Sequence, residues 1–339
     1  MSADPQPLDP LDPIADADAV IQRDAPALWE ALSPLGRRLR QPANFLPLQS
    51  AEARGKPFNA TIGQITDGRG KAVPLPSMEA AASGLDEARR SQGFLYSPVE
   101  GIAELRQLWR ERQLRGREGG APADRDLPSS LPVVTVGPAQ ALALAAELFV
   151  VEGRTVVVPD GAGDADRDLF AVRLGARCVG APCLSSGGFD PAAPARALSG
   201  IPESGPAVVV LRFPGEAHGY VPVSGERSAI RGSLFAAARH RPVIAIVDDT
   251  WAADPGVSVF WKLIGAHPNL IPVKVDGADA LGFPGGRVGF LTFPFEPDSP
   301  LARAVESKVK MLLRAAVGSP PALSQVLMIQ GLAPGVQGR

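Results

Sequence analysis

Lysine is scarce in this chain: only six of its 34 basic residues are lysines, and the others are arginines. The net charge is −2, so the excess of positive charge that nucleic-acid-binding and membrane-surface proteins carry is missing. Any chemistry that needs a side-chain amine therefore depends on very few residues, and each of them can be considered individually.

Cysteine, histidine and long apolar runs are also sparse. Cys178, Cys183 and the three histidines show no metal-ligand spacing, which predicts free thiols, a reduced compartment and no metal site. No basic region followed by an apolar run marks a signal peptide, and no apolar stretch reaches the roughly 20 residues of a membrane span. We therefore expect a cytoplasmic protein without nucleic-acid or membrane partners.

The composition that remains is that of an ordinary globular protein, with 45% hydrophobic and 21% charged residues. From about residue 131, continuously hydrophobic runs alternate with helical patterns, which is typical of strands buried on both faces and joined by helices. We expect an α/β protein with three α/β/α layers and a mostly parallel, seven-stranded sheet. The predicted strands are 132–136, 155–159, 176–180, 207–213, 243–249, 270–276 and 288–293, and the predicted helices include 139–151, 164–174, 227–239 and 300–331.

Composition divides the chain into four segments. Residues 1–30 are rich in Pro and Asp and predict a disordered acidic arm, either a solvated tail or a segment that crosses a partner subunit. Residues 31–125 are expected to pack on the large α/β domain, which spans 126–300. Residues 301–339 are predicted to be mainly helical.

Polar residues follow several predicted strands, at the edge where parallel sheets bind ligands. Gly137 precedes a helix start, which is either a phosphate cradle or an ordinary connection. Asp248 and Asp249 end a strand, where a carboxylate holds a protonated ring nitrogen or a metal, or caps a helix. Arg287 follows a glycine-rich turn and can meet a phosphate in bidentate fashion. His218 is either catalytic or structural.

Taken together, these loops resemble the class I/II aminotransferases, the fold-type-I pyridoxal-phosphate enzymes, over roughly residues 45–331. The resemblance is to a bacterial subgroup with an "NATIG" start and a "DGATKE" lysine loop, and it implies a pyridoxal-phosphate cofactor and a dimer. The stretches that carry it, in the order and spacing of the family, are "FNATIGQITDG" (58–68), "FLYSPVEG" (94–101), "VVTVGPAQ" (133–140), "RFPGEAHGY" (212–220), "AIVDDTW" (245–251) and "GGRVGF" (285–290).

The resemblance implies cofactor-binding roles for six residues. Asp248 matches the aspartate that pairs with the pyridine nitrogen, and Arg287 matches the arginine that clamps the phosphate. Tyr96 matches the tyrosine that reaches the phosphate from the neighbouring subunit. The phosphate-cradling turn corresponds to Gly137, Ala139 and Gln140.

The catalytic lysine of the family has no counterpart. Counting back eight residues from Arg287, the spacing of the family, reaches Asp279, and counting forward from "DGA" reaches Ala280. Lys274 lies at a strand position where the subgroup has an additional lysine, so we expect it to be structural. The resemblance therefore implies that no residue of this chain forms the Schiff base.

Other family positions are altered as well. The asparagine of the Asn-Pro-Thr-Gly loop falls near Glu216, the tyrosine that shares its role falls at Trp251, and the aromatic that stacks on the cofactor falls at about Gly163. The family continues into a C-terminal small domain that binds the substrate carboxylate. Residues 301–339 therefore match only a helical remnant that leads to a truncated small domain.

Three functions remain open. The first is a pseudoenzyme that acts as a scaffold or regulatory subunit, either as a homodimer or paired with an active paralogue, its cofactor lost or held non-covalently. The alternative is an active pyridoxal- or pyridoxamine-phosphate enzyme for an amino-acid-like substrate, which uses Lys274 or moves protons with His218 or Asp279. The third is a binding module that recognises a nucleotide or a protein at the same cleft. A small phosphorylated ligand is among the predicted partners.

Overall fold

We describe a computed structural model of the chain. The described residues are 17–39, 46–56, 61, 66–67, 70–115, 127–160, 164–185, 187–215 and 219–333. No helix within these ranges is both long enough and apolar enough to cross a membrane.

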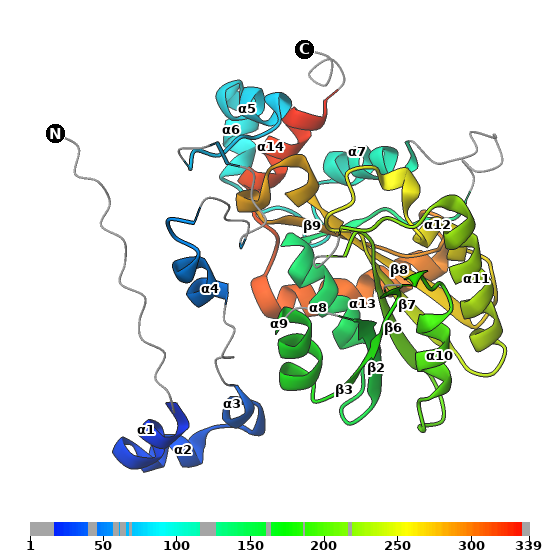
Figure 1. Cartoon of the computed structure of the whole chain (residues 1–339). Coiled ribbons are helices and arrows are strands. Elements are labelled where there is room, and N and C mark those ends of the chain that lie inside the picture. The colour runs from blue at the N-terminus through cyan, green and yellow to red at the C-terminus, as the bar shows by residue number, and fades with distance from the viewer. Residues whose placement is uncertain are drawn as a thin grey trace.

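A seven-stranded sheet in the order β1-β9-β8-β7-β6-β2-β3 forms the centre of the molecule (Figure 1). Strand β9 runs antiparallel to both of its neighbours, and the other pairs are parallel. The mostly parallel sheet is thus confirmed, and each of the seven predicted strands forms within two residues of its expected bounds. The strands are β1 Val133–Val136, β2 Thr155–Pro159, β3 Arg177–Ala181, β6 Ala207–Arg212, β7 Val243–Asp248, β8 Leu270–Gly277 and β9 Val288–Thr292.

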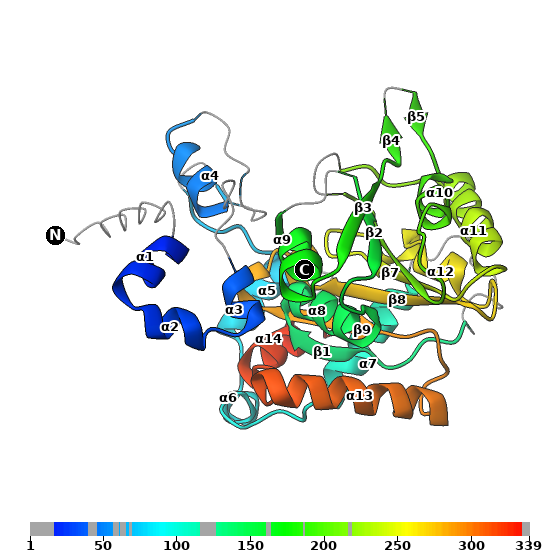
Figure 2. The same ribbon diagram turned by 90° about the horizontal axis from the view of Figure 1, so that it is seen from below.

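Helices cover both faces of the sheet, because successive side chains of a buried strand point to opposite sides. In β2, Val156 and Val158 pack toward α8 and α13, whereas Val157 packs toward α10, α11 and α12. Figure 2 shows α13 along one side of the sheet and α10 and α11 on the other. The expected three-layer architecture is confirmed. The covering helices are α8 Gly137–Phe149, α13 Pro300–Val317, α10 Ala193–Ser199, α11 Ser224–Ala238 and α12 Phe260–Leu263.

Segments from the two halves of the chain pack together at the β1–β9 side of the sheet (Figure 1). The Trp109 ring stacks on Phe290 with ring centroids 4.1 Å apart, and Met328 joins the same apolar cluster. Arg106 donates from Nε to the Pro132 carbonyl and pairs with Glu306. The helices involved are α5 Pro76–Ser83, α6 Glu87–Gly93, α7 Ala103–Leu114 and α14 Ala322–Leu332.

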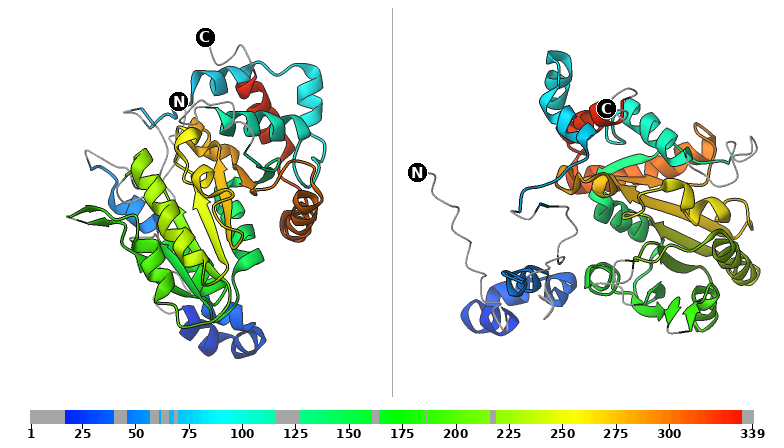
Figure 3. Two further views of the ribbon diagram at one scale, coloured as in Figure 1. Left: turned by 90° about the vertical axis from the view of Figure 1, so that its right-hand side faces the viewer. Right: turned by 45° about the horizontal axis from the view of Figure 1, so that its top comes forward.

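The described part of the predicted acidic arm is helical. Helices α1 (Ala17–Asp24) and α2 (Pro26–Ala31) bury no residue, and the right-hand view of Figure 3 shows them to one side of the sheet. Pro and Asp concentrate in residues 1–16, which lie outside the described ranges, whereas 17–24 contains good helix formers. Helix α3 (Pro34–Arg38) does reach the sheet domain, where Arg38 Nη1 lies 2.7 Å from Glu152 Oε1. The domain boundaries stay predictions.

Candidate functional site

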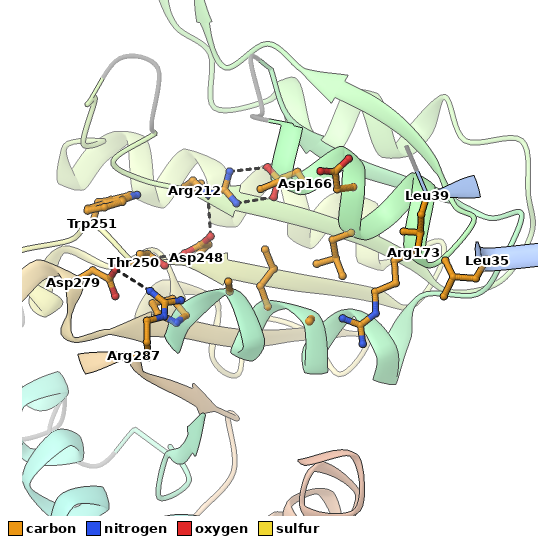
Figure 4. Close-up of a pocket in the computed structure, with 17 residues that line it drawn as sticks. Leu35, Leu39, Asp166, Arg173, Arg212, Asp248, Thr250, Trp251, Asp279 and Arg287 are labelled. Atoms are coloured by element: carbon orange, nitrogen blue, oxygen red, sulfur yellow. Dashed lines mark hydrogen bonds and ion pairs between the residues drawn. The ribbon is translucent and has the colours of Figure 1, made fainter. Parts of the chain in front are cut away.

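A cavity of about 640 Å³ lies where the chain changes direction in the sheet (Figure 4). Strand β3 adds to one side of β2, whereas β6, β7 and β8 follow on the other side. Such a reversal leaves a crevice at the carboxyl ends of the strands, and the volume is that of a small-molecule site. The lining comes from α8, α9 (Asp164–Arg167), η2 (Asp168–Arg173), the ends of β6 and β7, η4 (Ala278–Leu281), Arg287 and the α3 segment.

Arg287 lies against the first turn of α8. A Cβ added to Gly137 would come within 2.4 Å of Arg287 Nη2, so only glycine permits this approach. Gly137 also has a φ of 78°, in the left-handed region that glycine adopts freely. Because the first N–H groups of a helix lack intrahelical partners, Arg287 and this turn together favour an anion. The structure brings Gly137, Ala139 and Arg287 together, and their roles in cofactor binding stay predictions.

Two predicted cofactor-binding residues lie elsewhere. The Gln140 side chain folds back, and its Oε1 accepts a hydrogen bond from the Val136 N–H at 2.6 Å, which caps α8. Gln140 therefore stays out of the cavity lining. Tyr96 is 98% exposed, and it does not line the cavity of its own chain. Its contact with the site of a neighbouring subunit stays a prediction.

Asp248 ends β7 inside the cavity with both carboxylate oxygens in use. Its Oδ2 accepts from Arg212 Nε at 2.9 Å, and its Oδ1 accepts from the Thr250 N–H at 3.0 Å and the Thr250 hydroxyl at 2.6 Å. Arg212 also donates from Nη1 and Nη2 to the two oxygens of Asp166, at 2.7 and 2.8 Å. All three charged side chains are buried (Figure 4).

Sequence reasoning missed Arg212. The available signal was an arginine that ends the hydrophobic run "AVVVLR", at the strand edge where ligands bind. Its partner Asp166 carried no signal of its own, because it belongs to a helical segment 46 residues earlier in the chain.

Asp279 and Ala280 face different spaces. Asp279 lines the large cavity, whereas Ala280 lines a separate hollow of about 10 Å³. Asp279 Oδ1 lies 4.0 Å from Arg287 Nη1, and Oδ2 is buried without a hydrogen-bond partner. Burial raises the pKa of the Asp279 carboxyl above its ordinary value; Arg287 opposes this effect and Asp248 adds to it.

Lys274 is fully buried next to the small hollow and does not line the large cavity. Its ammonium pairs with Asp249 and lies 3.5 Å from Asp276 Oδ2. Asp276 also accepts from Trp109 Nε1 and from Gln113 Nε2, each at 3.0 Å. Burial alone would lower the pKa of Lys274, but the two carboxylates outweigh it and hold that pKa above its ordinary value. The amine therefore stays protonated at neutral pH.

Of the other residues that the sequence analysis singled out, one lines the cavity and three lie outside the described residues. Trp251 lines the cavity and lies near Asp279 in Figure 4. Gly163, Glu216 and His218 lie outside the described residues. The free thiols, Cys178 and Cys183, have no part in the cavity, and burial raises the pKa of Cys183 to about 11.

No protein-family model and no curated protein matches the sequence. Solved aminotransferase structures do match the fold. An aminotransferase from Anaerococcus prevotii has a TM-score of 0.70 and 18% identity, over 84% of this chain and 70% of that one. The aromatic-amino-acid aminotransferase from Burkholderia pseudomallei, covalently bound to pyridoxal phosphate, has a TM-score of 0.69 and 19% identity, over 91% and 76%. An aminotransferase from Mycobacterium tuberculosis has a TM-score of 0.61 and 24% identity, over 90% and 70%.

These similarities establish the fold. The chain has the fold of these aminotransferases, which confirms the expected architecture.

Proposed function

We propose that this chain uses the aminotransferase fold as a pseudoenzyme, a scaffold or regulatory subunit that performs no transamination. The supporting observation is the position of its amines. Transamination needs an unprotonated lysine amine beside the cofactor. All six lysines belong to the described residues, and none of them lines the large cavity. Lys274, the lysine closest in sequence to the family position, is held by Asp249 and Asp276.

The lining residues fit pyridoxal phosphate at one end only. Arg287 and the first turn of α8 suit its phosphate. Asp248 does not offer a free carboxylate to a protonated ring nitrogen, because Arg212 and Thr250 already bind both of its oxygens. At the position predicted for the lysine, Asp279 cannot form an imine. These contacts support non-covalent binding of a small phosphorylated ligand and do not support covalent attachment of the cofactor.

The test is a covalent-labelling experiment. The protein is incubated with excess pyridoxal phosphate, its visible spectrum is recorded, and borohydride reduction is followed by mass spectrometry. We expect an unlabelled chain, while an aminotransferase with a lysine-bound cofactor, treated in parallel, is labelled. A reduced adduct on any of the six lysines, above all on Lys274, would contradict the proposal.

The same assay can test the position of the missing amine. We expect Asp279→Lys to give a reducible pyridoxal-phosphate adduct on most of the protein, since this residue lines the large cavity beside Arg287. The matched variant Ala280→Lys is expected to stay unlabelled, because position 280 faces a hollow of about 10 Å³, no larger than one water. Melting curves verify that both variants fold. Labelling of Ala280→Lys alone would refute the assignment of the family position to Asp279.

We also propose that two copies of the chain associate through the segment that carries Tyr96. Phe94, Leu95 and Tyr96 are all strongly exposed, although two of them are large apolar residues. We expect dimers in sedimentation velocity, with Leu95→Asp raising the dissociation constant about 30-fold or more, as loss of an interface hot spot does. Val151→Asp, at another exposed apolar position, is the control. If the wild-type chain sedimented as a monomer, Tyr96 could not reach the cavity of a second copy. Tyr96 would then act only in a complex with a different partner chain.

A further inference from the structure

The outward side of helix α13 presents positive charges to the solvent. Glu306 and Lys310 of this helix are already paired with residues of other segments. Arg303, Lys308 and Arg314 are exposed, and none of them forms an ion pair with another described residue. The helix dipole favours a cation in the last turn, but only Arg314 lies there. This side of α13 therefore attracts negative charge.

An apolar side chain lies among these cations. Met311 is 64% exposed. Lys308 and Arg314 come three residues before and after it, and residues at this spacing are neighbours on a helix surface. Arg303 lies about two turns before Met311. Exposed methionines are frequent on surfaces that bind other protein segments. We call Arg303, Lys308, Met311 and Arg314 the α13 face.

The opposite side of α13 is already covered. Val309 and Leu313 are fully buried in the core cluster that α13 shares with α8. A basic amphipathic helix binds a membrane by inserting its apolar side, and here that side packs on the sheet. A net charge of −2 and three unpaired cations are too little for a nucleic-acid surface. The α13 face therefore fits an acidic protein segment that also carries apolar side chains.

The chain itself contains such a segment. Residues 1–16 hold four aspartates and no lysine or arginine, and they repeat Leu-Asp-Pro at 8–10 and 11–13. Each repeat places a large apolar side chain next to a carboxylate, as the α13 face places Met311 next to cations. A segment of this length spans at most about 55 Å, and a compact chain of this size has a radius of gyration of about 20 Å. It is therefore long enough to reach α13 from Ala17, where α1 begins.

We propose that residues 1–16 dock on the α13 face of the same molecule. Their carboxylates bind the three cations, and their leucines cover Met311. The proposal concerns a surface far in function from the large cavity, because no residue of the α13 face lines that cavity.

Carbodiimide cross-linking of the full chain, followed by mass spectrometry, tests the proposal. The reagent joins an aspartate carboxylate to a nearby lysine amine as an amide. Lys56, Lys71 and Lys308 are all exposed, so each can report a neighbouring carboxylate. We expect residues 1–16 to be linked to Lys308 about 10-fold more than to Lys71, because docking raises the local concentration of carboxylates at α13. In a mixture of isotope-labelled and unlabelled copies, the link is expected within one chain.

Charge variants of α13 test the recognition without removing a reacting group. Arg303→Gln combined with Arg314→Gln is expected to lower the yield at Lys308 about 3- to 10-fold, the range for two exposed charge contacts. Arg231→Gln combined with Arg239→Gln removes the same charge from exposed positions at α11 and is the control. An ionic strength of about 1 M, at which the screening length is about 3 Å, should also lower the yield.

Peroxide oxidation of Met311 gives a second readout that does not use lysine. The two other methionines of the described residues are buried, so they react slowly. We expect Asp9→Asn combined with Asp12→Asn to speed the oxidation of Met311 about 3-fold or more, because Met311 is then uncovered for a larger fraction of the time. Glu79→Gln combined with Glu87→Gln, at exposed positions of α5 and α6, removes the same charge and should leave the rate unchanged.

The proposal would be overturned by the absence of any link, or by links distributed evenly over the exposed lysines. It would also be overturned by a yield that the arginine double variant leaves unchanged, or by a Met311 oxidation rate that the aspartate double variant leaves unchanged. A link found only between labelled and unlabelled copies would overturn it too and would assign the α13 face to a second molecule. None of these measurements involves a cofactor or a Schiff base, so they do not depend on the pseudoenzyme proposal.

Discussion

Replacement of Lys274 by methionine is expected to lower the free energy of unfolding by about 3–5 kcal/mol, the usual cost of removing one partner from a buried ion pair. Methionine fills a similar volume but leaves Asp249 without its cation, and it removes the ammonium that lies 3.5 Å from Asp276 Oδ2. Ser258, Trp109 and Gln113 would still donate to these carboxylates, but they cannot neutralise them.

Urea unfolding monitored by tryptophan fluorescence measures this loss. Lys308→Met is the control, because Lys308 is exposed and its substitution should change stability by less than about 0.5 kcal/mol. Lys274→Met combined with Asp249→Asn should recover part of the loss, since one of the two carboxylates is then neutral. A loss below about 1 kcal/mol for Lys274→Met would show that the ion pairs do not hold the amine as firmly as their burial indicates.

We expect the loss of unfolding free energy caused by Lys274→Met to become smaller at acidic pH. Burial raises the pKa of Asp249 above its ordinary value even with Lys274 present, and removal of the ammonium raises it further. A carboxyl whose folded-state pKa is raised destabilises the fold as pH rises through that pKa, and this penalty is absent below its unfolded value near pH 4. The difference between wild type and Lys274→Met is therefore expected to be largest at neutral pH and smaller in acid.

The sequence was sufficient to predict the sheet because buried parallel strands are continuously hydrophobic. Six of the strands gave that signal and residues 176–180 gave a weaker one, and the helices between them excluded an all-antiparallel arrangement. The direction of β9 was not predictable, because the burial of Val288–Thr292 on both faces gives the same pattern in either direction. Strand β3 forms within one residue of its predicted bounds, although it is an exposed edge strand in which only Ala181 is buried.

Residues of the cavity could be predicted only where a general structural rule says at which end of a strand or helix a ligand binds. The rule that ligands bind at the carboxyl ends of parallel strands pointed to Asp248, which lines the cavity, and to Gly137, which lies against the lining residue Arg287. Gln140 lies in the correct turn, but local hydrogen bonding to Val136 turned its side chain away. The pairing of Arg212 with Asp166 depends on tertiary packing between distant segments, and no local pattern encodes it.

Replacement of Arg212 by methionine is the second change with a large expected effect, again about 3–5 kcal/mol of unfolding free energy. Arg212 is the shared cation of two buried carboxylates, so its loss leaves Asp166 without both of its hydrogen bonds from Nη1 and Nη2. Asp248 keeps its two bonds from Thr250 but loses its charged partner.

A charge-free variant separates this effect from the loss of packing. Arg212→Met combined with Asp166→Asn and Asp248→Asn removes the cation and both anions together, and buried ion clusters replaced in this way often lose little stability. We expect the triple variant to unfold at a urea concentration between those of Arg212→Met and the wild type. Arg173→Met is the control from the same cavity wall: its pair with Glu147 is half exposed, so it should contribute about 1 kcal/mol or less. If Arg212→Met were no less stable than Arg173→Met, Asp248 would not need its arginine. A free Asp248 carboxylate would then be available to a ring nitrogen, and the argument against an aminotransferase cofactor at that position would fail.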